Sequence, residues 1–175
     1  MKKKIATHNF TISEDTPTYV IAEIGINHNG KFDLAEKLIV QSAKAGVNAV
    51  KFQKRNSKEF LPKEVYDSPH PVSVNSYGES YGEHREFLEF NLDKHRELKE
   101  FCDSLEIQYS CSVWDVTSAK GIIALNPPTI KVPSACNINE KIVGYHCDHY
   151  SGEIHISLGM TSLKEEEGIL EFLKK

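Results

Sequence analysis

Five apolar runs rich in β-branched residues recur along the chain, and a stretch with helical periodicity follows each of them. The runs occupy residues 19–26, 47–53, 107–113, 129–134 and 153–159. Strands that alternate with amphipathic helices are typical of parallel βαβ units, in which each crossover helix covers the sheet. The sequence therefore predicts an α/β fold with about five βα units over residues 19–175, preceded by a short capping β-hairpin over residues 1–18.

Side-chain spacing also predicts where several helices begin. Asp33 with Glu36, and Ser162 with Glu165, have the three-residue spacing of a capping box, in which each side chain bonds the backbone of the other residue. Large apolar residues at helical spacing predict one long helix over residues 83–105. The segment 67–82 before it is polar, rich in turn residues and long for a connector, which favours a functional loop.

Composition limits the classes of partner. The chain has 175 residues, of which 39% are hydrophobic and 26% charged, with a formal net charge of -4 from interspersed charges. This pattern indicates about one domain that binds a small polar metabolite, with no nucleic-acid or membrane surface. The sequence has no apolar stretch of roughly 18 residues and does not begin like a signal peptide, so we expect a cytoplasmic protein. No two of its four cysteines have C-x-x-C spacing, and we expect reduced thiols.

Polar side chains near the strand ends indicate where a site would lie. Five βα units fit either an open doubly wound sheet or part of a (βα)8 barrel, and both folds bind ligands at the carboxyl ends of their strands. Lys51 and Lys131 interrupt otherwise apolar strands, which is costly unless each ammonium meets an anion. Ser134 and Ser157 add hydroxyl donors. The set predicts a site for phosphate and carboxylate groups, the alternative being that each lysine only extends to solvent.

Two histidine segments raise the question of a metal. "NHNG" follows the first strand, and Gly30 permits a tight turn there, so we expect His28 to be a hydrogen-bonding residue, with a metal ligand as the alternative. "YHCDHY" at 145–150 holds two histidines and a cysteine but lacks a second ligand pair. We expect it to be a surface loop rather than a zinc site.

Five segments in order resemble one family. "YVIAEIGINHNG", "VKFQ", "YGEHREFLEFN", "IKVPSA" and "ISLGM" closely resemble the sialic acid synthase family. The resemblance implies a (βα)8 barrel followed by an antifreeze-like domain, and so favours the barrel over the open sheet. It also implies condensation of phosphoenolpyruvate with N-acetylmannosamine or a related amino sugar to give a nonulosonic acid and phosphate. "YGEHREFLEF" is most similar to the animal-type synthases, which use the 6-phosphate sugar.

The resemblance also implies roles for individual residues. Glu23, Lys51 and Lys131 would be the catalytic residues. Lys51 and Lys131 would hold phosphoenolpyruvate together with Ser134 and Ser157, and Glu23 would contact the acceptor sugar near its reacting carbon. Gln53 would lie beside that sugar, and Asn75 in the long loop would contact its N-acyl group. A divalent metal, Mn²⁺ or Mg²⁺, is expected for the complete enzyme, with ligands outside this segment and none within it. We further expect a homodimer.

The chain departs from the family pattern in two ways. Cys111 and Cys136 stand where family members commonly have a hydroxyl and an acidic residue, so Ser110 or Ser112 would take over a phosphate contact. The second departure is that only about five of eight barrel units are present, without the antifreeze-like domain. We therefore expect an incomplete catalytic segment that is inactive alone. The alternatives are a non-catalytic half-barrel that binds sugar or phosphate, and another phosphoenolpyruvate-dependent sugar-acid synthase.

Overall fold

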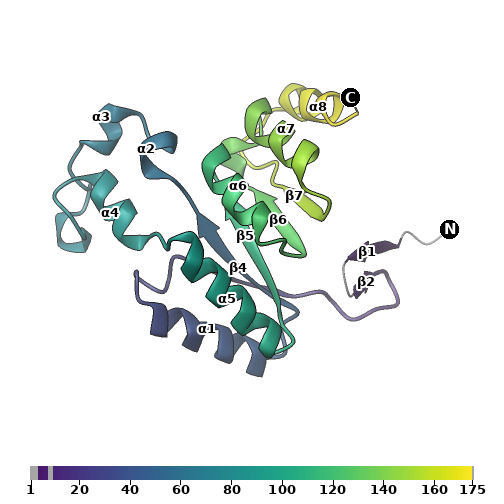
Figure 1. The fold of residues 1–175 in the computed structure, drawn as a ribbon. Helices are drawn as coiled ribbons and strands as arrows, with labels where there is room; N and C mark the ends of the chain where they lie inside the picture. The colour runs from purple at the N-terminus through teal and green to yellow at the C-terminus, as the bar shows by residue number, and fades with distance from the viewer. Residues whose placement is uncertain (1–3, 8–9, 175) are drawn as a thin grey trace.

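A short hairpin precedes the main body of the protein. The computed structural model describes residues 4–7 and 10–174. Strands β1 (Ile5–Thr7) and β2 (Phe10–Ile12) pair antiparallel, with Ile5 opposite Ile12. The hairpin lies apart from the helices (Figure 1). The predicted short hairpin is thus confirmed in strands β1 and β2, while residues 1–3 and 8–9 of its predicted range lie outside the described residues.

One parallel sheet forms the centre of the described residues. Its strands are β3 (Ile21–Gly25), β4 (Ala49–Lys54), β5 (Gln108–Val113), β6 (Thr129–Val132) and β7 (Glu153–Ile156). They pair in parallel in their order along the chain, β3-β4-β5-β6-β7. In a doubly wound sheet the chain adds later strands to the opposite edge after a switch point, whereas in a (βα)8 barrel each new strand is added to the same edge. The predicted α/β barrel units are confirmed.

Helices connect and cover these strands. They are α1 (Phe32–Lys44), α2 (Ser57–Phe60), α3 (Lys63–Tyr66), α4 (Tyr81–Leu88), α5 (Leu92–Ser104), α6 (Val116–Ala124), α7 (Glu140–His149) and α8 (Leu163–Phe172), with 3-10 turns η1 (Ser73–Asn75) and η2 (Ser134–Cys136). Helices α1 and α5 lie side by side, and α6 packs beside α7 (Figure 1). The short helices α2 and α3 lie with α4 beyond the end of β4, where the long polar connector is found.

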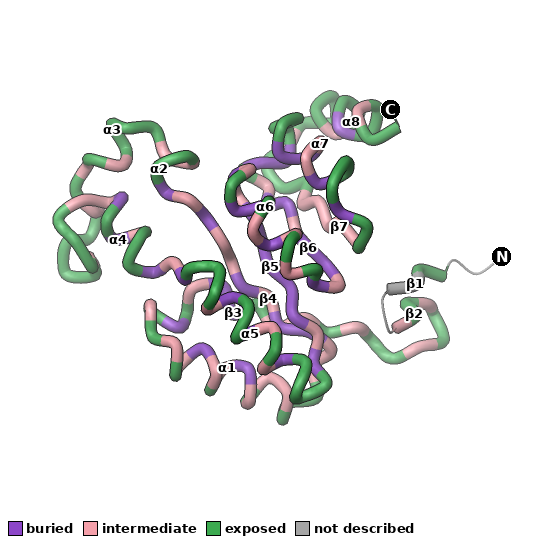
Figure 2. Tube along the Cα trace, viewed as in Figure 1, coloured by how far each residue is buried: buried purple, intermediate pink, exposed green. Residues whose placement is uncertain are grey.

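The main core lies between the sheet and the helices. Phe52, Tyr109 and Ile130, from three neighbouring strands, are fully buried against Ile39 of α1 and Leu98 of α5. Figure 2 shows buried residues along the central strands and exposed residues on the outer turns of the helices. Because strand side chains alternate between faces, the residues between these core positions must point to the opposite face of the sheet.

The helix predicted over residues 83–105 is wrong as a single element. Residues 89–91 interrupt it, and Glu89 has an extended backbone between α4 and α5. The Glu89 carboxylate instead accepts hydrogen bonds from the backbone N–H of Arg55 at 2.9 Å and from its Nε at 2.7 Å. Asn91 then begins α5, since its side chain accepts a bond from the Lys94 N–H. The buried ion pair and the cap together explain the break.

Two further local predictions are corrected and one is confirmed. Helix α1 begins after Lys31, whose side chain makes no cap, and Asp33 lies in the first turn, paired with Lys37 at 3.1 Å. Ser162 and Glu165 do form the predicted capping box of α8. The prediction of a surface loop at 145–150 is wrong, because this segment forms the last part of α7 and the residue that caps it, Tyr150. His146 is fully buried there and donates from Nδ1 to the Ile142 carbonyl.

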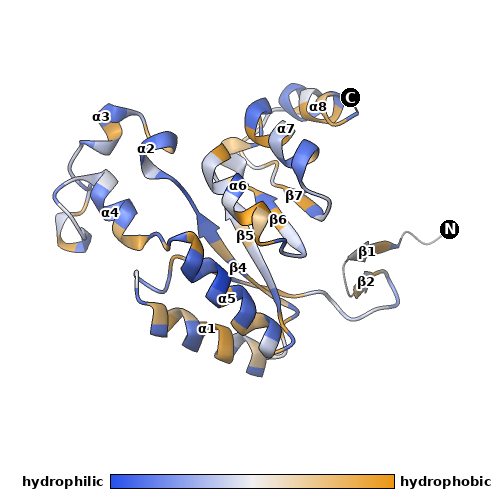
Figure 3. Ribbon diagram, viewed as in Figure 1, coloured by the Kyte–Doolittle hydropathy of each residue, from blue (hydrophilic) through white to orange (hydrophobic). Residues whose placement is uncertain are grey.

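Hydropathy along the helices matches this arrangement. Figure 3 shows hydrophobic and hydrophilic residues alternating along α1, as expected for a helix with one face on the core. Among the described residues, no helix is long and apolar enough to span a membrane.

Removing one partner of the ion pair between Arg55 and Glu89 should destabilise the fold. Both side chains are less than one-tenth exposed, at 4% and 8%. Removing one partner leaves a buried charge uncompensated, so Glu89→Ala should lower the free energy of unfolding by about 3 kcal/mol or more. Urea unfolding measures this loss. Glu86→Ala is the matched control, because the Glu86 side chain is 41% exposed and pairs with the exposed Lys58 at 3.6 Å. Equal small losses for both variants would contradict the assigned importance of Glu89.

Candidate active site

One face of the sheet carries almost only polar side chains. It is the face opposite the helices, and we call it the polar face. Its members alternate with the core residues on all five strands, and they are Glu23, Lys51, Gln53, Ser110, Ser112, Thr129, Lys131, Glu153 and His155. The sequence thus places hydroxyl, carboxylate, ammonium and imidazole groups on a single surface.

Strand register arranges these residues in two rows. The lower row runs across the strands through Glu23, Lys51, Ser110, Thr129 and Glu153, which are successive register partners. The upper row, two residues nearer the carboxyl ends, runs through Gln53, Ser112, Lys131 and His155. The rows bring together most of the residues that the sequence singled out.

The three charged residues predicted for catalysis lie close enough to interact. Lys51 Nζ lies 2.8 Å from Glu23 Oε2, and the Glu23 side chain is 51% exposed at the sheet edge. Burial lowers the pKa of Lys131, and the positive charge of Lys51 lowers it further, while Glu23 opposes the shift. Lys131 makes no ion pair with another described residue. The polar face therefore offers one lysine in an ion pair and one without a counter-ion.

The two serines predicted from the loops lie at the carboxyl edge of the sheet. Ser134 begins η2, directly after β6, and its Oγ lies 2.9 Å from where a Cβ on Gly159 would be. The Ser157 N–H donates to the Val132 carbonyl, and its own carbonyl accepts from Asn137 Nδ2 at 2.8 Å. The loops after β6 and β7 thus meet immediately beyond Lys131.

The serines of β5 differ in what they can offer. Ser110 is 1% exposed and donates its hydroxyl to the Thr129 carbonyl at 3.1 Å, so its proton is already used. Ser112 is the register partner of Lys131, and its hydroxyl makes no hydrogen bond to another described residue. Ser112 is therefore the better donor for a ligand beside Lys131.

The two cysteines at departing positions lie away from the polar face. Cys111 is fully buried in the core on the opposite face of β5. Cys136 is buried too, and its Sγ approaches the Trp114 carbonyl at 3.4 Å. Burial raises the pKa of Cys136 to about 11 and also raises that of Cys111. Neither group is a nucleophile at neutral pH. All four cysteines are free thiols.

A backbone irregularity positions Gln53. The pairing of β3 with β4 shifts between Glu23 and Gly25, and Gly25 has a φ of 55°. A Cβ at Gly25 would lie 3.1 Å from Gln53 Nε2 and 4.0 Å from Glu23 Oε1. The missing side chain leaves room for Gln53 beside Glu23.

Asn75 lies outside the two rows. It lines a cavity of about 490 Å³ between the connector before α4 and the turn after β3, together with Asn27, Asn29, His70 and Tyr77 among others. The Tyr77 ring stacks on His84 and Phe87, with ring centroids 5.6 and 4.4 Å away. The long connector is therefore packed against "NHNG", and amide and aromatic side chains line the space between them.

His28 anchors this turn. It is 2% exposed, its ring stacks on Phe90 at 4.1 Å, and its Nδ1 accepts the Gly30 N–H at 3.1 Å. Burial lowers the pKa of His28 to about 4, and the nearby Lys94 adds to the shift. Within residues 4–7 and 10–174, no group of three or more His, Cys, Asp or Glu side chains could hold a metal ion. The geometry favours the predicted hydrogen-bonding role for His28.

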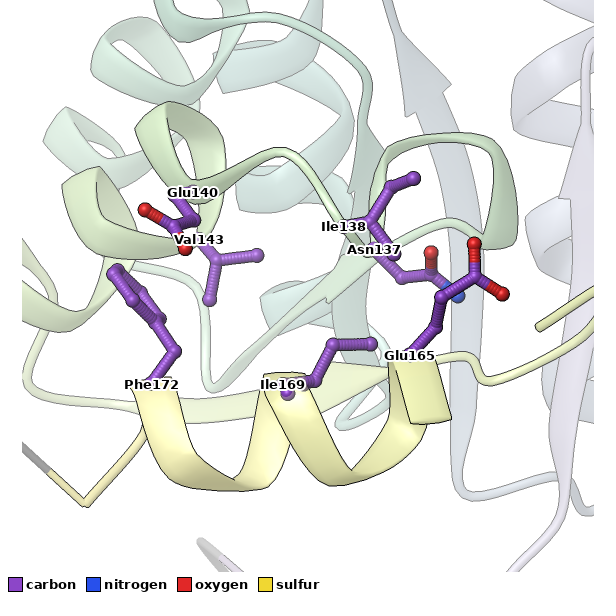
Figure 4. A pocket seen from close by; sticks show the side chains of 8 residues that line it. Asn137, Ile138, Glu140, Val143, Glu165, Ile169 and Phe172 are labelled. Carbon is purple, nitrogen blue, oxygen red and sulfur yellow. The ribbon is translucent and has the colours of Figure 1, made fainter. Parts of the chain in front are cut away.

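A second cavity has a different character. It occupies about 210 Å³ between α7 and α8 and is lined mainly by apolar side chains, including Val143, Ile169 and Phe172 (Figure 4). Glu140 and Glu165 stand at its rim. None of the residues predicted to form the site lines this cavity, so it is separate from the polar face.

Sequence reasoning missed three members of the polar face. Thr129, Glu153 and His155 belong to predicted strands. Each lies two residues from another residue of the polar face and next to a residue that packs on the core. Applying the two-residue alternation to β6 and β7 would have found them. The carboxyl ends of β6 and β7 point only to Lys131 and Ser157.

Comparison with known proteins identifies the family. A model described as NeuB family matches residues 38–175. The chain belongs to the NeuB family. It is 33% identical over 168 residues to N-acetylneuraminate-9-phosphate synthase of Drosophila melanogaster, covering 90% of this chain and 42% of that protein. It is 29% identical to N,N'-diacetyllegionaminic acid synthase of Legionella pneumophila, covering 89% of this chain and 44% of that protein. The chain thus spans less than half the length of these two relatives.

Solved structures agree with the NeuB assignment. The crystal structure of N-acetylneuraminic acid synthetase from Leptospira borgpetersenii, in complex with citrate, superimposes with a TM-score of 0.80 at 26% identity. The match covers 99% of this chain and 56% of that one. A truncated 3-deoxy-D-arabino-heptulosonate 7-phosphate synthase from Thermotoga maritima has a TM-score of 0.64 at 9% identity, which shows a shared barrel fold alone.

The role of Gly25 can be separated from ordinary backbone strain. Gly25→Ala and Gly46→Ala both place alanine at a positive φ, of 55° and 76°, and each should cost about 1–2 kcal/mol. Only the first adds a contact, since nothing lies within 4 Å of a Cβ at Gly46. NMR of side-chain amides should show the Gln53 signals shifted in Gly25→Ala and unchanged in Gly46→Ala. Unshifted Gln53 signals in both variants would contradict this packing.

His28 should make stability depend on pH. Above pH 6.5 the imidazole is neutral in folded and unfolded chains, so it contributes no pH dependence. Between pH 6.5 and about 4 only the unfolded chain binds its proton, so stability falls as pH falls, by about 1.4 kcal/mol per pH unit for this one proton. Urea unfolding from pH 6.5 to 5 gives the slope of the unfolding free energy against pH. This slope should be smaller in His28→Gln by about 1.4 kcal/mol per pH unit, the contribution of about one proton. Identical slopes in the wild type and in His28→Gln would refute the assignment.

Proposed function

We propose that the protein carrying this chain is a phosphoenolpyruvate-dependent synthase. It would condense phosphoenolpyruvate with N-acetylmannosamine or a related amino sugar, giving a nonulosonic acid and phosphate. The observation that carries the proposal is the position of Lys131. A half-buried ammonium with a second lysine nearby and no counter-ion among the described residues is a site prepared for an anion.

The anionic substrate would lie across the upper row. Lys131 would bind its phosphate or carboxylate, with Ser112 beside it and the loop serines Ser134 and Ser157 at the edge. Lys51 has three N–H donors and uses one toward Glu23, so it can bind a second anionic oxygen. Phosphoenolpyruvate carries a phosphate and a carboxylate on adjacent atoms, which suits two lysines on neighbouring rows.

The chemistry assigns a part to Glu23. Carbon 3 of phosphoenolpyruvate forms a bond to the sugar aldehyde carbon, a water oxygen bonds to carbon 2, and the bond between carbon 2 and the phosphate oxygen breaks. One water proton ends on the aldehyde oxygen, which becomes a hydroxyl, and the other leaves with the phosphate. Positive charge develops at carbon 2 and negative charge on the aldehyde oxygen. A carboxylate at the sheet edge, half exposed and held by Lys51, can stabilise the former, and the ammonium groups can stabilise the latter.

The acceptor sugar would enter from the side of β3. Gln53, placed by the Gly25 irregularity, would contact it beside Glu23. Asn75 would contact its N-acyl group in the cavity shared with Asn27 and Asn29, where amide and aromatic side chains suit a neutral polar substituent. The two relatives are named for a 9-phosphate product and for a diacetylated legionaminic acid. Both products are made from an acylated amino sugar, which is the acceptor class proposed here.

The complete protein is expected to supply further parts. β3 and β7 are the edge strands of the described sheet, and we propose that additional barrel units and an antifreeze-like domain complete the enzyme. We also propose a cytoplasmic homodimer that uses Mn²⁺ or Mg²⁺. The residues described here contain no cluster that fits such an ion, so its ligands would come from outside them. Residues 1–175 alone should be inactive.

Phosphate release by the full-length protein tests the proposal. With Mn²⁺, phosphoenolpyruvate and N-acetylmannosamine or its 6-phosphate, the wild type should release phosphate. Lys131→Ala should raise the KM for phosphoenolpyruvate by about tenfold or more with little change in the KM for the sugar, while Glu23→Gln should lower kcat by roughly 100-fold. Lys164→Ala, an exposed lysine of α8, is the control and should leave both constants unchanged.

Two outcomes would argue against it. A folded wild type that releases no phosphate with any of several acylated amino sugars would remove the synthase assignment. Equal increases of both KM values in Lys131→Ala would remove the specific role of that lysine.

A further inference from the structure

Lys131 forms an ion pair with no carboxylate of the described residues, although two carboxylates lie on its face of the sheet. A half-buried lysine is stabilised by pairing with a carboxylate that it can reach, because the pairing offsets part of its loss of hydration. Glu23 and Glu153 are the carboxylates on the polar face, at opposite edges of the sheet. Other contacts must therefore hold each carboxylate away from Lys131.

Each carboxylate is held by a different basic residue. Lys51 Nζ binds Glu23 at 2.8 Å on the β3 side. On the β7 side, His155 Nε2 lies 2.7 Å from Glu153 Oε1, two residues away along the same strand. A carboxylate only accepts hydrogen bonds here, so the imidazole Nε2 is the donor.

Glu153 would otherwise be able to reach Lys131. Thr129 is the register partner of Glu153, and His155 is the register partner of Lys131, so Glu153 and Lys131 are diagonal neighbours on adjacent strands. The strand spacing and the rise of two residues put their Cα atoms roughly 8 Å apart. Two long side chains span this separation easily. The Glu153 side chain is 29% exposed, so it has room on its solvent side to change rotamer.

The electrostatics of Lys131 agree with a carboxylate held away from it. The pKa of Lys131 is lowered by burial and by Lys51, and the only carboxylate that counteracts this shift is Glu23. Glu153, on the adjacent strand, adds nothing comparable.

We propose that His155 is a positioning residue that holds Glu153 on β7 and so keeps Lys131 free to bind the anionic substrate. The imidazole need not touch the substrate. Its effect comes from removing an internal competitor: if Glu153 paired with Lys131, only the fraction of molecules with that pair open could bind the anion, and the apparent affinity would fall by that fraction. The inference rests on the proposed function only in naming phosphoenolpyruvate as that anion.

Four variants of the full-length protein test the inference. In His155→Leu the donor is lost and Glu153 is released, so the Kd of phosphoenolpyruvate measured by calorimetry should rise by about tenfold, as expected if Glu153 occupies Lys131 nine-tenths of the time. Adding Glu153→Gln to this variant removes the competitor and should restore Kd to within about threefold of the wild type. Glu153→Gln alone should bind nearly as the wild type does, and His155→Gln, which keeps a donor, should lose less affinity than His155→Leu.

The double variant distinguishes positioning from simple damage. If His155→Leu weakened binding by disturbing β7, the second substitution would not restore it, and that result would overturn the inference. Wild-type affinity in His155→Leu would overturn it as well. Thermal unfolding confirms that each variant is folded, and His155→Gln provides the comparison should His155→Leu fail to fold.

Inorganic phosphate separates this inference from the proposed function. A wild type that binds phosphate but not phosphoenolpyruvate would contradict the proposed function. The same four variants titrated with phosphate would still show loss and restoration if His155 holds Glu153 away from Lys131, and would show neither if it does not.

Discussion

The in-register alternation of side chains along five parallel strands is the constraint on which the rest of the structure depends. Phe52, Tyr109 and Ile130 are fully buried beneath the helices, and they fix which residues face the other way. A shift of one residue in any strand would put its charged groups into the apolar core and its apolar groups on the polar face. The positions of Lys51 and Lys131 are therefore set by the packing of their apolar neighbours, before any ligand is considered.

A second set of contacts fixes the carboxyl end of the sheet. Glu89 accepts bonds from the backbone and side chain of Arg55, just beyond β4. Asp115 caps α6 through Ser118 and also accepts the Asn56 N–H at 2.7 Å. Two buried carboxylates thus tie the segment after β4 to the junction of α4 and α5 and to α6. Buried contacts of this kind restrict the backbone at the carboxyl end of the sheet more firmly than exposed ion pairs do.

Much of this arrangement could be predicted from the sequence, because it depends on local alternation. The five strands, the hairpin and the capping box at Ser162 follow from periodicity and residue type. The break at Glu89 did not, since it depends on a partner 34 residues earlier in the chain. The burial of His146 likewise depends on tertiary packing, while its sequence neighbours Cys147 and Asp148 are exposed. Cys111 follows from local alternation: the family resemblance puts a hydroxyl at its position and Ser110 or Ser112 as the replacement, and alternation along β5 turns Cys111 into the core and both serines to the polar face.

The ionised groups of the polar face have a consequence for how a ligand arrives. The two carboxylates Glu23 and Glu153 balance the two ammonium groups Lys51 and Lys131, and the chain as a whole has a formal net charge of -4. Beyond about 10 Å, which is roughly the screening length in 0.1 M salt, an approaching anion therefore meets little attraction from this surface. Under the proposed function, capture would depend on short-range hydrogen bonds formed after contact, so encounter would be governed by diffusion and collision geometry, with selectivity expressed in how slowly the bound anion leaves.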